Sequence, residues 1–247
     1  MDSDKVILHP TKVLITGTSS GIGYGLASEY LKRGHVVYGI SRKTHDDLSA
    51  YQNYHHLSMD LTKFKEVDQK LCEFLNDEDS IDIAILNAGF LSEIKDLKNT
   101  DIDTLQYSMD LNVWANKVII DTLLDCVEEV TQIVAISSGA AASGSRGWNA
   151  YAISKAALNM LVSLYAKEQP QTHFCALAPG IIDTSMQDYI SSLEDDERFP
   201  IIARLKSIKG TEEMPKPDEA AKTLIKAFDT LTHMKSGSFI DVSELIS

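Results

Sequence analysis

The amino-acid sequence predicts an α/β fold, in which a single domain is built on a parallel sheet with helices on both faces. Short apolar runs alternate along the chain with longer segments of helical periodicity. Runs that lack polar alternation suit strands buried on both faces of a sheet. The chain has 247 residues, and no linker, internal repeat or low-complexity tract divides it. We therefore expect one domain over residues 1–247.

The first part of the chain predicts three strands and two helices. The helical segment Gly23–Gly34 ends on a glycine, which suits a C-cap, and its apolar face consists of Leu26, Ala27, Tyr30 and Leu31. Thr62 is expected to cap a second helix that runs to about Asn76, with Phe64, Val67, Leu71, Phe74 and Leu75 inward. Strands are expected over Lys12–Gly17, His35–Ser41 and Tyr54–Asp60.

The second part of the chain continues the alternation. A long helical stretch covers Asp101–Glu128, with a break expected near its start. Two further helices are expected over Asn149–Glu168 and Pro217–His233, and four strands over Ile81–Gly89, Val130–Ser138, Thr172–Gly180 and Gly237–Val242. Residues 184–216 interrupt the rhythm. This charged segment follows the carboxyl end of a strand, where long insertions tend to cover ligand sites, so we expect it to cover the substrate.

Composition disfavours several classes of protein. The formal net charge is −13 and the sequence pI is near 4.9, so phosphate backbones and anionic lipid would repel the chain, which disfavours nucleic-acid and membrane partners. The acidic start lacks the features of a signal peptide, and we expect a cytoplasmic protein. Three scattered cysteines, Cys72, Cys126 and Cys175, lie in apolar periodic stretches and are expected to be reduced thiols. No metal-ligand cluster is recognisable.

A glycine loop lies between the first predicted strand and the first helix. It reads TGTSSGIG, with Gly17, Gly21 and Gly23 in the spacing Gly-x-x-x-Gly-x-Gly. Gly17 suits the tight turn, Gly21 lets the chain approach a pyrophosphate, and Gly23 lets helix and strand pack closely. Amide groups at the helix start would face the anion. A mere turn is the alternative, but the position directly after the first strand favours a dinucleotide site.

The second predicted strand ends without an acid. An NAD site usually has an acidic residue there, for the ribose hydroxyl, whereas this chain has Ser41 and Arg42. Arginine binds a 2′-phosphate bidentately, which favours NADP(H) over NAD(H). An exposed arginine with no role is the ordinary alternative.

Four further motifs join the glycine loop in a recognisable order. They are Asn87–Gly89 (NAG), Ser138, which precedes Tyr151 by 13 residues (151 − 138), the pair Tyr151 and Lys155 in YAISK, and Pro179–Thr184 (PGIIDT). A tyrosine and a lysine four residues apart on a helix arise often by chance. In this order, however, the motifs resemble the short-chain dehydrogenase/reductase family over nearly the whole chain. Within it the chain looks most similar to small carbonyl reductases of the benzil and sepiapterin reductase type.

The resemblance implies a doubly wound Rossmann-type domain with seven parallel strands. It also implies a nicotinamide cofactor across the strand ends and a catalytic centre of Ser138, Tyr151 and Lys155, with Asn112 helping to order a water behind the lysine. The positions matching cofactor contacts, the glycine loop included, are Gly17, Ser20, Gly21, Ile22, Gly23, Ser41, Arg42, Asp60, Leu61, Asn87, Ala88, Gly89, Tyr151, Lys155, Pro179, Gly180, Ile182 and Thr184.

Two positions depart from the family pattern. Leu86 stands where the family usually has a first asparagine before NAG, and Asn87 remains to fill the role. The C-terminal segment lacks the double glycine common in tetrameric members, which disfavours a tetramer and leaves a homodimer or a monomer open.

The chemistry of a carbonyl reductase explains the expected centre. Hydride transfer to a carbonyl builds negative charge on oxygen, and Tyr151 would donate the proton, with a pKa that the Lys155 ammonium is expected to lower. Ser138 would hydrogen-bond the same oxygen. Trp148 lies about one helical turn from Tyr151 and is either a wall for an aromatic substrate or a packing or dimer-contact residue.

We therefore expect NADPH-dependent reduction of a ketone, such as an aromatic α-diketone, to an α-hydroxyketone. The alternatives are an NADP-linked alcohol or hydroxysteroid dehydrogenase and a non-catalytic NADP(H) sensor.

Overall fold

The computed structural model describes residues 10–245 and shows seven parallel strands in one sheet, in the order β3-β2-β1-β4-β5-β6-β7. The strands are β1 (Lys12–Thr16), β2 (Val36–Ser41), β3 (Tyr54–Ser58), β4 (Ser80–Leu86), β5 (Glu129–Ile136), β6 (His173–Ala178) and β7 (Ser238–Asp241). The order reverses at the β1–β4 pair, because β2 and β3 lie to one side of it and β5 to β7 to the other. The doubly wound fold predicted from the sequence is confirmed.

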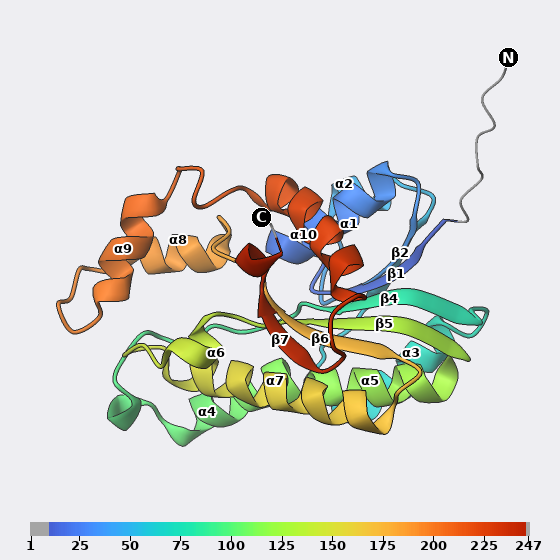
Figure 1. Cartoon of the computed structure of the whole chain (residues 1–247), viewed down its shortest axis with the longest axis horizontal. Coiled ribbons are helices and arrows are strands. Elements are labelled where there is room, and N and C mark those ends of the chain that lie inside the picture. Colours follow the sequence, from blue (N-terminus) through green and yellow to red (C-terminus); the bar gives the residue numbers. More distant parts are fainter. Residues whose placement is uncertain (1–9, 246–247) are drawn as a thin grey trace, which may run out of the picture.

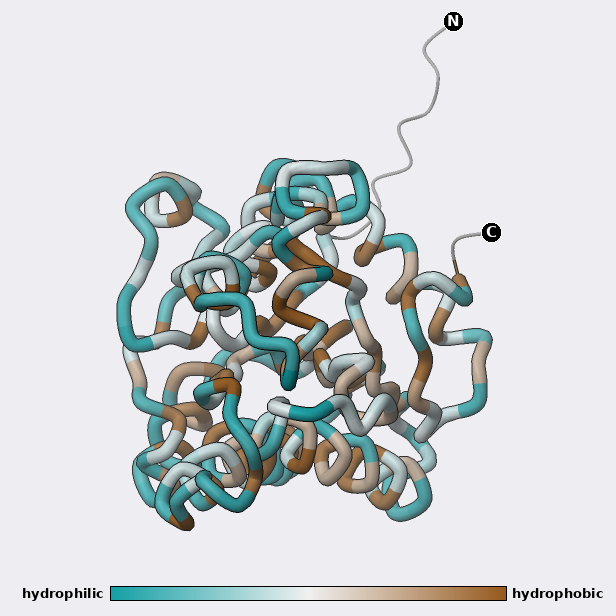
Figure 2. The backbone as a smooth tube through the Cα atoms, turned by 90° about the vertical axis from the view of Figure 1, so that its left-hand side faces the viewer, coloured by the Kyte–Doolittle hydropathy of each residue, from teal (hydrophilic) through white to brown (hydrophobic). Residues whose placement is uncertain are grey.

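Helices cover both faces of this sheet (Figure 1). One face carries α1 (Gly21–Lys32) and α10 (Pro217–Leu231), with the short α2 (Asp46–Ser49) beside them. The other face carries α3 (Phe64–Phe74), α5 (Ala115–Cys126) and α7 (Asn149–Glu168). Successive residues of a buried strand serve the two layers in turn: Val13 and Ile15 pack toward α1 and α10, and Leu14 packs toward the opposite layer. Apolar stretches accordingly gather in the interior of the molecule (Figure 2).

The long helical stretch after β4 is divided in its middle. It consists of α4 (Ile102–Met109), a π-helical turn η2 (Asp110–Trp114) and α5. The break was expected near the start of the stretch, and that expectation was wrong. A π-turn inserts an extra residue into the helix and re-aims the side chains next to it, which is why such turns are frequent at functional sites.

The segment after β6 forms two helices, α8 (Ser185–Ser192) and α9 (Pro200–Ile208). They lie at the left of Figure 1, on the same side as the short α6 (Ala140–Ser143). They have a small apolar cluster of their own, made of Ile190, Phe199, Ile202, Leu205, Ile208 and Met214. Residues 184–216 therefore form two helices that pack on each other through this cluster.

Two expectations about single residues were wrong. Thr62 does not cap α3, whose N-cap is Lys63, because both the amide and the hydroxyl of Thr62 donate hydrogen bonds to Asp60.

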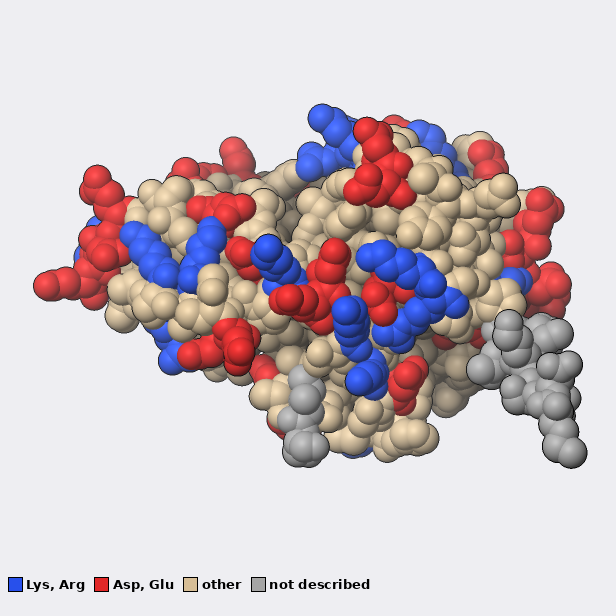
Figure 3. All heavy atoms as spheres, turned by 90° about the horizontal axis from the view of Figure 1, so that it is seen from above, with Lys and Arg blue, Asp and Glu red and all other residues tan. Residues whose placement is uncertain are grey.

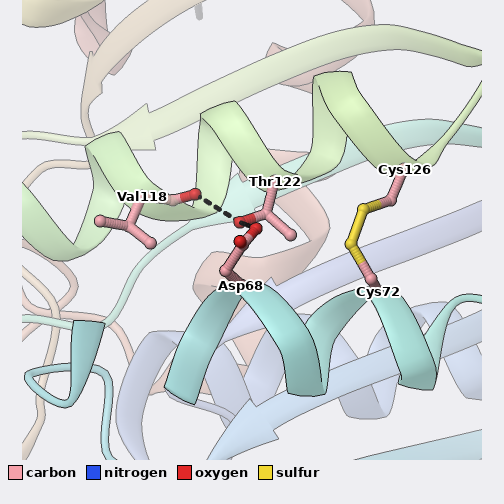
Figure 4. The surroundings of a disulfide bond; sticks show 5 residues. All are labelled: Asp68, Cys72, Val118, Thr122 and Cys126. Atoms are coloured by element: carbon pink, nitrogen blue, oxygen red, sulfur yellow. Dashed lines mark hydrogen bonds between the residues drawn. A yellow bond between two sulfur atoms is a disulfide. The ribbon is translucent and has the colours of Figure 1, made fainter. Parts of the chain in front are cut away.

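Two of the three cysteines are not free thiols: Cys72 of α3 and Cys126 of α5 form a disulfide, with 5.6 Å between their Cα atoms (Figure 4). Cys175 is free and buried, as expected. Adjacent helices bring two cysteines together that lie 54 residues apart in the chain.

Basic and acidic side chains are mixed on the face seen in Figure 3, where Lys and Arg side chains stand next to Asp and Glu side chains. In residues 10–245, no helix is both long enough and apolar enough to cross a membrane.

Candidate active site

A cavity of about 590 Å³ opens at the carboxyl ends of the strands. It spans the point where the strand order reverses, the usual ligand site of doubly wound sheets, and its volume suits an organic ligand. All predicted site residues except Gly23 and Asn112 line it. The lining members are Gly17, Ser20, Gly21, Ile22, Ser41, Arg42, Asp60, Leu61, Asn87, Ala88, Gly89, Ser138, Trp148, Tyr151, Lys155, Pro179, Gly180, Ile182 and Thr184.

The glycine loop has the geometry of a phosphate cradle. Gly17 has a φ of +78° and Gly21 a φ of +58°, which L side chains rarely adopt. Gly23 lies behind the cavity: a Cβ there would approach the Gly17 carbonyl oxygen to 2.3 Å. The role expected for Gly23, close packing of helix on strand, matches this position. Because Gly17 and Gly21 have no side chains, the backbone at the start of α1 is open to an anion.

Asn87 holds the loop from the neighbouring strand end. Its side-chain amide donates to the Thr16 carbonyl over 2.9 Å, and its backbone amide donates to the Thr16 hydroxyl over 2.9 Å. The Asn87 side chain thus ties the end of β4 to the end of β1. Ala88 and Gly89 continue this wall of the cavity.

Arg42 lies at the far end of the cavity with an exposed side chain. Asp60 faces the same corner, where hydrogen bonds from the amide and hydroxyl of Thr62 hold the pKa of its carboxyl below the ordinary value. Leu61 beside it is buried. The corner therefore combines one exposed guanidinium with an acid whose oxygen is already engaged.

Ser138, Tyr151 and Lys155 meet at the other end. Ser138 follows the end of β5, and its hydroxyl accepts a hydrogen bond from the Ala140 amide at 3.1 Å. Tyr151 and Lys155 lie one turn apart on α7, and the Lys155 Nζ is 5.7 Å from the centre of the Tyr151 ring. The Lys155 ammonium donates to the Ile136 carbonyl over 2.6 Å. Strand end and helix thus bring a hydroxyl, a phenol and an amine to one place.

The proton affinities at this centre follow from burial. Burial lowers the pKa of Lys155 to about 8. It also raises the pKa of Tyr151, and a hydrogen bond with Ser138 opposes that shift. The expected lowering of the Tyr151 pKa by Lys155 was therefore wrong for the protein alone, because desolvation of the phenolate is the larger effect.

Asn112 lies behind the centre, in the π-turn. Its side-chain oxygen accepts from the Phe90 amide at 2.7 Å, and its nitrogen donates to the Phe90 carbonyl and to Ser154 of α7. A Cβ on Gly89 would lie 3.3 Å from the Asn112 oxygen and 3.6 Å from the Lys155 Nζ. Asn112 therefore sits on the lysine side of the cavity but joins three elements through direct hydrogen bonds.

The segment after β6 closes over the glycine loop. A Cβ on Gly21 would meet the Thr184 methyl at 3.4 Å, and the Asp183 amide donates to the Pro215 carbonyl at 2.9 Å. Pro179, Gly180 and Ile182 line the cavity between these points. The start and end of the insertion are thus fastened next to the cradle.

Trp148 both packs and lines the cavity. Its ring centre lies 5.8 Å from that of Tyr151, at an interplanar angle of 44°. It also packs against the apolar cluster of α8 and α9. The sequence left a substrate wall and a packing residue as alternatives. The Trp148 side chain is placed for both, because it lines the cavity and packs against the cluster.

Several lining residues were not identified from the sequence. Six of them belong to the insertion, namely Ser185, Met186, Gln187, Ile190, Ile201 and Leu205, and others are Leu91, Ile181 and Tyr107 of α4. The available signal was the insertion's position after a strand end, which predicts cover for a site and does not say which side chains turn inward.

A phosphate cradle at the switch point of a doubly wound sheet, joined to a Ser–Tyr–Lys centre, defines the class of nicotinamide-dependent oxidoreductases. The family model described as short chain dehydrogenase matches residues 11–195, and the chain belongs to this family. A benzil reductase ((S)-benzoin forming) of Bacillus subtilis (strain 168) is 30% identical over 94% of this chain and 98% of its own length.

One further sequence relative and one solved structure are also similar to this chain. An NADPH-dependent pterin aldehyde reductase of Arabidopsis thaliana is 30% identical over 73% of this chain and 78% of its own length. The crystal structure of a short-chain dehydrogenase/reductase from Saccharomyces cerevisiae superposes with a TM-score of 0.81 at 24% identity, covering 94% of this chain and 96% of that one. The chain is accordingly an oxidoreductase of the short-chain family, whose members use nicotinamide cofactors.

Proposed function

We propose that this protein is an NADPH-dependent ketone reductase whose substrates are aromatic α-diketones such as benzil, each reduced to an α-hydroxyketone. The observation that carries the proposal is the convergence of Ser138, Tyr151 and Lys155 beside the Trp148 ring, in a cavity whose other end holds the glycine loop and Arg42. The names of the bacterial benzil reductase and the plant pterin aldehyde reductase support the reaction class and the cofactor.

The residues present fit the cofactor from end to end. Arg42 would bind the 2′-phosphate, Asp60 would meet the adenine, and the loop Gly17–Gly23 would face the pyrophosphate. Lys155 would hold the ribose hydroxyls at the nicotinamide end, and Pro179–Thr184 would lie along its carboxamide. When bound, NADPH supplies the hydride.

The side chains at the nicotinamide end manage the proton and the charge. As negative charge develops on the carbonyl oxygen, the Tyr151 hydroxyl donates its proton to that oxygen and Ser138 donates a hydrogen bond to it. The phenolate left behind is stabilised by the Lys155 ammonium, which is 5.7 Å from the ring centre. Proton transfer from solvent then restores the phenol.

The substrate end is largely apolar. Its lining consists of Trp148, Leu91, Ile181, Met186, Ile190 and Leu205. An aromatic ring next to the reacting carbonyl would pack on Trp148 in an offset or tilted arrangement. Residues 184–216 supply much of this wall, and we propose that they cover the substrate.

A substrate screen with both cofactors tests the proposal. Purified protein is mixed with benzil, phenylpropanedione, sepiapterin or simple aldehydes, and oxidation of NADPH and of NADH is followed. We expect turnover of the aromatic diketones with NADPH. Oxidation of alcohols or hydroxysteroids as the only activity would favour the dehydrogenase alternative, and absence of turnover with all of them would contradict the reductase.

Tyr151→Phe separates an enzyme from a sensor. The variant lacks only the hydroxyl, so we expect turnover to fall by at least about 100-fold while NADPH binding persists. Turnover unchanged in this variant would remove Tyr151 from the chemistry, and binding without turnover in the wild type would favour the NADP(H) sensor.

We also propose a cytoplasmic homodimer. The exposed apolar side chains Ile153, Met160 and Leu164 recur at positions i, i+7 and i+11 of α7 and share one face of the helix. Gel filtration with light scattering should give a molar mass of two chains for the wild type. The same measurement on Met160→Lys should give the mass of one chain. A single-chain mass for the wild type would contradict the dimer.

A further inference from the structure

A partly buried hydrogen-bond network lies behind the Arg42 corner. Thr18 of the glycine loop, Ser41 at the end of β2, and Tyr54 and His56 of β3 form it, and we call these four residues the hydroxyl network. The Thr18 hydroxyl is 3.2 Å from the Ser41 hydroxyl and 3.0 Å from the Tyr54 hydroxyl. The Ser41 hydroxyl is 3.0 Å from the Nε2 atom of His56. Thr18 is fully buried and Ser41 nearly so.

One bond sets the direction of all the others. The Ser41 hydroxyl donates to the Lys43 carbonyl over 2.8 Å, and a serine hydroxyl has a single proton to donate. Its contacts with Thr18 and His56 are therefore bonds that it accepts. Thr18 in turn spends its one proton on Ser41, so the bond between Thr18 and Tyr54 is donated by Tyr54.

The same reasoning assigns the tautomer of His56. Its Nε2 must carry the proton, because Ser41 can only accept from it. Burial lowers the pKa of His56, which agrees with a neutral ring. Ser41 then has one donated and two accepted bonds, so its hydroxyl has no capacity left for a ligand.

A glycine in the middle of β2 makes room for this network. Gly39 lies in a buried strand, where glycine is ordinarily unfavourable. A Cβ at this position would lie 2.5 Å from the Tyr54 hydroxyl oxygen and 2.9 Å from the Thr18 hydroxyl oxygen. Any larger residue would push the two hydroxyls apart.

The network holds the backbone that carries Arg42. The Lys43 carbonyl accepts from Ser41, and the Arg42 carbonyl accepts from the Ser58 hydroxyl over 3.1 Å. Both peptide groups after β2 are thus anchored, while the Arg42 side chain is exposed, lines the cavity and makes no salt bridge within the described part of the chain. Through Thr18 the same network reaches the glycine loop.

We propose that the hydroxyl network is the positioning device for discrimination between NADP(H) and NAD(H). Ser41, Tyr54 and His56 act through Arg42 by fixing where its guanidinium stands relative to the phosphate cradle, and Ser41 touches no cofactor with its hydroxyl. The inference rests on the proposed preference for NADPH. It replaces the expectation that Ser41 is itself a cofactor contact with a role one step behind the contact.

Calorimetric titrations with NADPH and NADH test the proposal on the full chain. Ser41→Ala removes the centre of the network and should raise the Kd for NADPH about tenfold while changing the Kd for NADH less than about threefold. Tyr54→Phe removes one hydroxyl and should shift the same ratio in the same direction, by a smaller factor. Tyr51→Phe is the matched control, because Tyr51 lies outside the network, and it should leave both constants unchanged.

A double-mutant cycle shows whether the network acts through Arg42. If it does, Ser41→Ala adds nothing to the loss of NADPH affinity in an Arg42→Ala background. Equal losses for both cofactors, or additive losses in the cycle, would overturn the inference. Should Ser41→Ala fail to fold, Tyr54→Phe takes its place in the cycle and the same outcomes decide.

The two proposals can fail separately. A wild-type protein that binds NADH as tightly as NADPH would contradict the proposed cofactor. A wild type that prefers NADPH, together with a Ser41→Ala variant that keeps the full preference, would contradict only the role of the network.

Discussion

The Lys155 ammonium donates a hydrogen bond to the Ile136 carbonyl over 2.6 Å, in a position where the lysine is only 4% exposed. A long cationic side chain on α7 is thus anchored to the last residue of β5. Burial lowers its pKa from 10.5 to about 8. The charged form of Lys155 therefore lowers the free energy of unfolding at neutral pH. Its hydrogen bond to Ile136 fixes its position relative to the sheet.

This lowered pKa predicts a pH-dependent stability. Between pH 8 and 10.5 the unfolded chain holds a proton at Lys155 that the folded chain has released, so the contribution of Lys155 to the free energy of unfolding should rise with pH by about 3 kcal/mol relative to Lys155→Met. Below pH 8 both states are protonated and the contribution is flat. Urea unfolding of wild type and Lys155→Met across this range, without cofactor, measures the effect. Parallel curves for the two proteins would contradict it.

Gly23→Ala should weaken the cradle from behind. The added Cβ would lie 2.3 Å from the Gly17 carbonyl oxygen and 2.6 Å from the Asn87 amide nitrogen, so backbone must move. We expect a loss of about 1–3 kcal/mol in the free energy of unfolding, together with weaker binding of both cofactors. Gly139→Ala is the control for stability, because a Cβ there meets nothing within 4 Å. A Gly23→Ala protein as stable as the control would contradict the packing argument.

The disulfide between Cys72 and Cys126 should stabilise the fold. Closing a loop with a sequence separation of 54 removes unfolded-state entropy worth about 4 kcal/mol. Dithiothreitol should therefore lower the unfolding midpoint of the wild type and leave that of Cys72→Ala/Cys126→Ala unchanged. Titration of denatured, unreduced protein should find one thiol, that of Cys175.

Three titratable thiols in freshly purified protein would show that Cys72 and Cys126 are reduced. That is the state the cytosol favours, because its thiol pools keep most cysteines reduced. The thiol count therefore also bears on the proposed compartment.

Phe199→Leu should alter the substrate end without touching the substrate. Phe199 is buried in the cluster against which Trp148 packs, with the guanidinium groups of Arg198 and Arg146 5.1 and 5.8 Å from its ring centre. A smaller side chain would leave Trp148 less firmly held. We expect the KM for an aromatic diketone to rise about fivefold, by the loss of roughly 1 kcal/mol of packing, and that for a small aldehyde to stay constant.

Trp148 fluorescence gives this prediction a second readout. The chain has two tryptophans, and Trp114→Phe leaves Trp148 alone. In that background Phe199→Leu should shift the emission to longer wavelength as water reaches the indole. Phe64→Leu in α3, away from this cluster, is the control. An unchanged spectrum with a raised KM would mean that Phe199 acts by another route.

The sequence by itself determined the layers, the strand count and the place of the glycine loop between the first strand and the first helix. Apolar runs such as Lys12–Gly17 and Ile81–Gly89 predict buried strands from their composition alone. The pair Tyr151 and Lys155 is also local, because residues four apart lie one helical turn from each other. The helix expected over about Asn149–Glu168 agrees with α7 for the same reason, because helical periodicity is a local property of the sequence.

Only the tertiary structure decided what depends on distance between segments. The disulfide joins Cys72 to Cys126 because α3 packs beside α5, and neither cysteine carries a local signal of the other. The direction of the Tyr151 pKa shift follows from the burial of the phenol, which sequence spacing does not contain. Likewise the Ser41 hydroxyl points into a network drawn from three segments, because side-chain orientation is settled by packing between elements rather than by the residues within one.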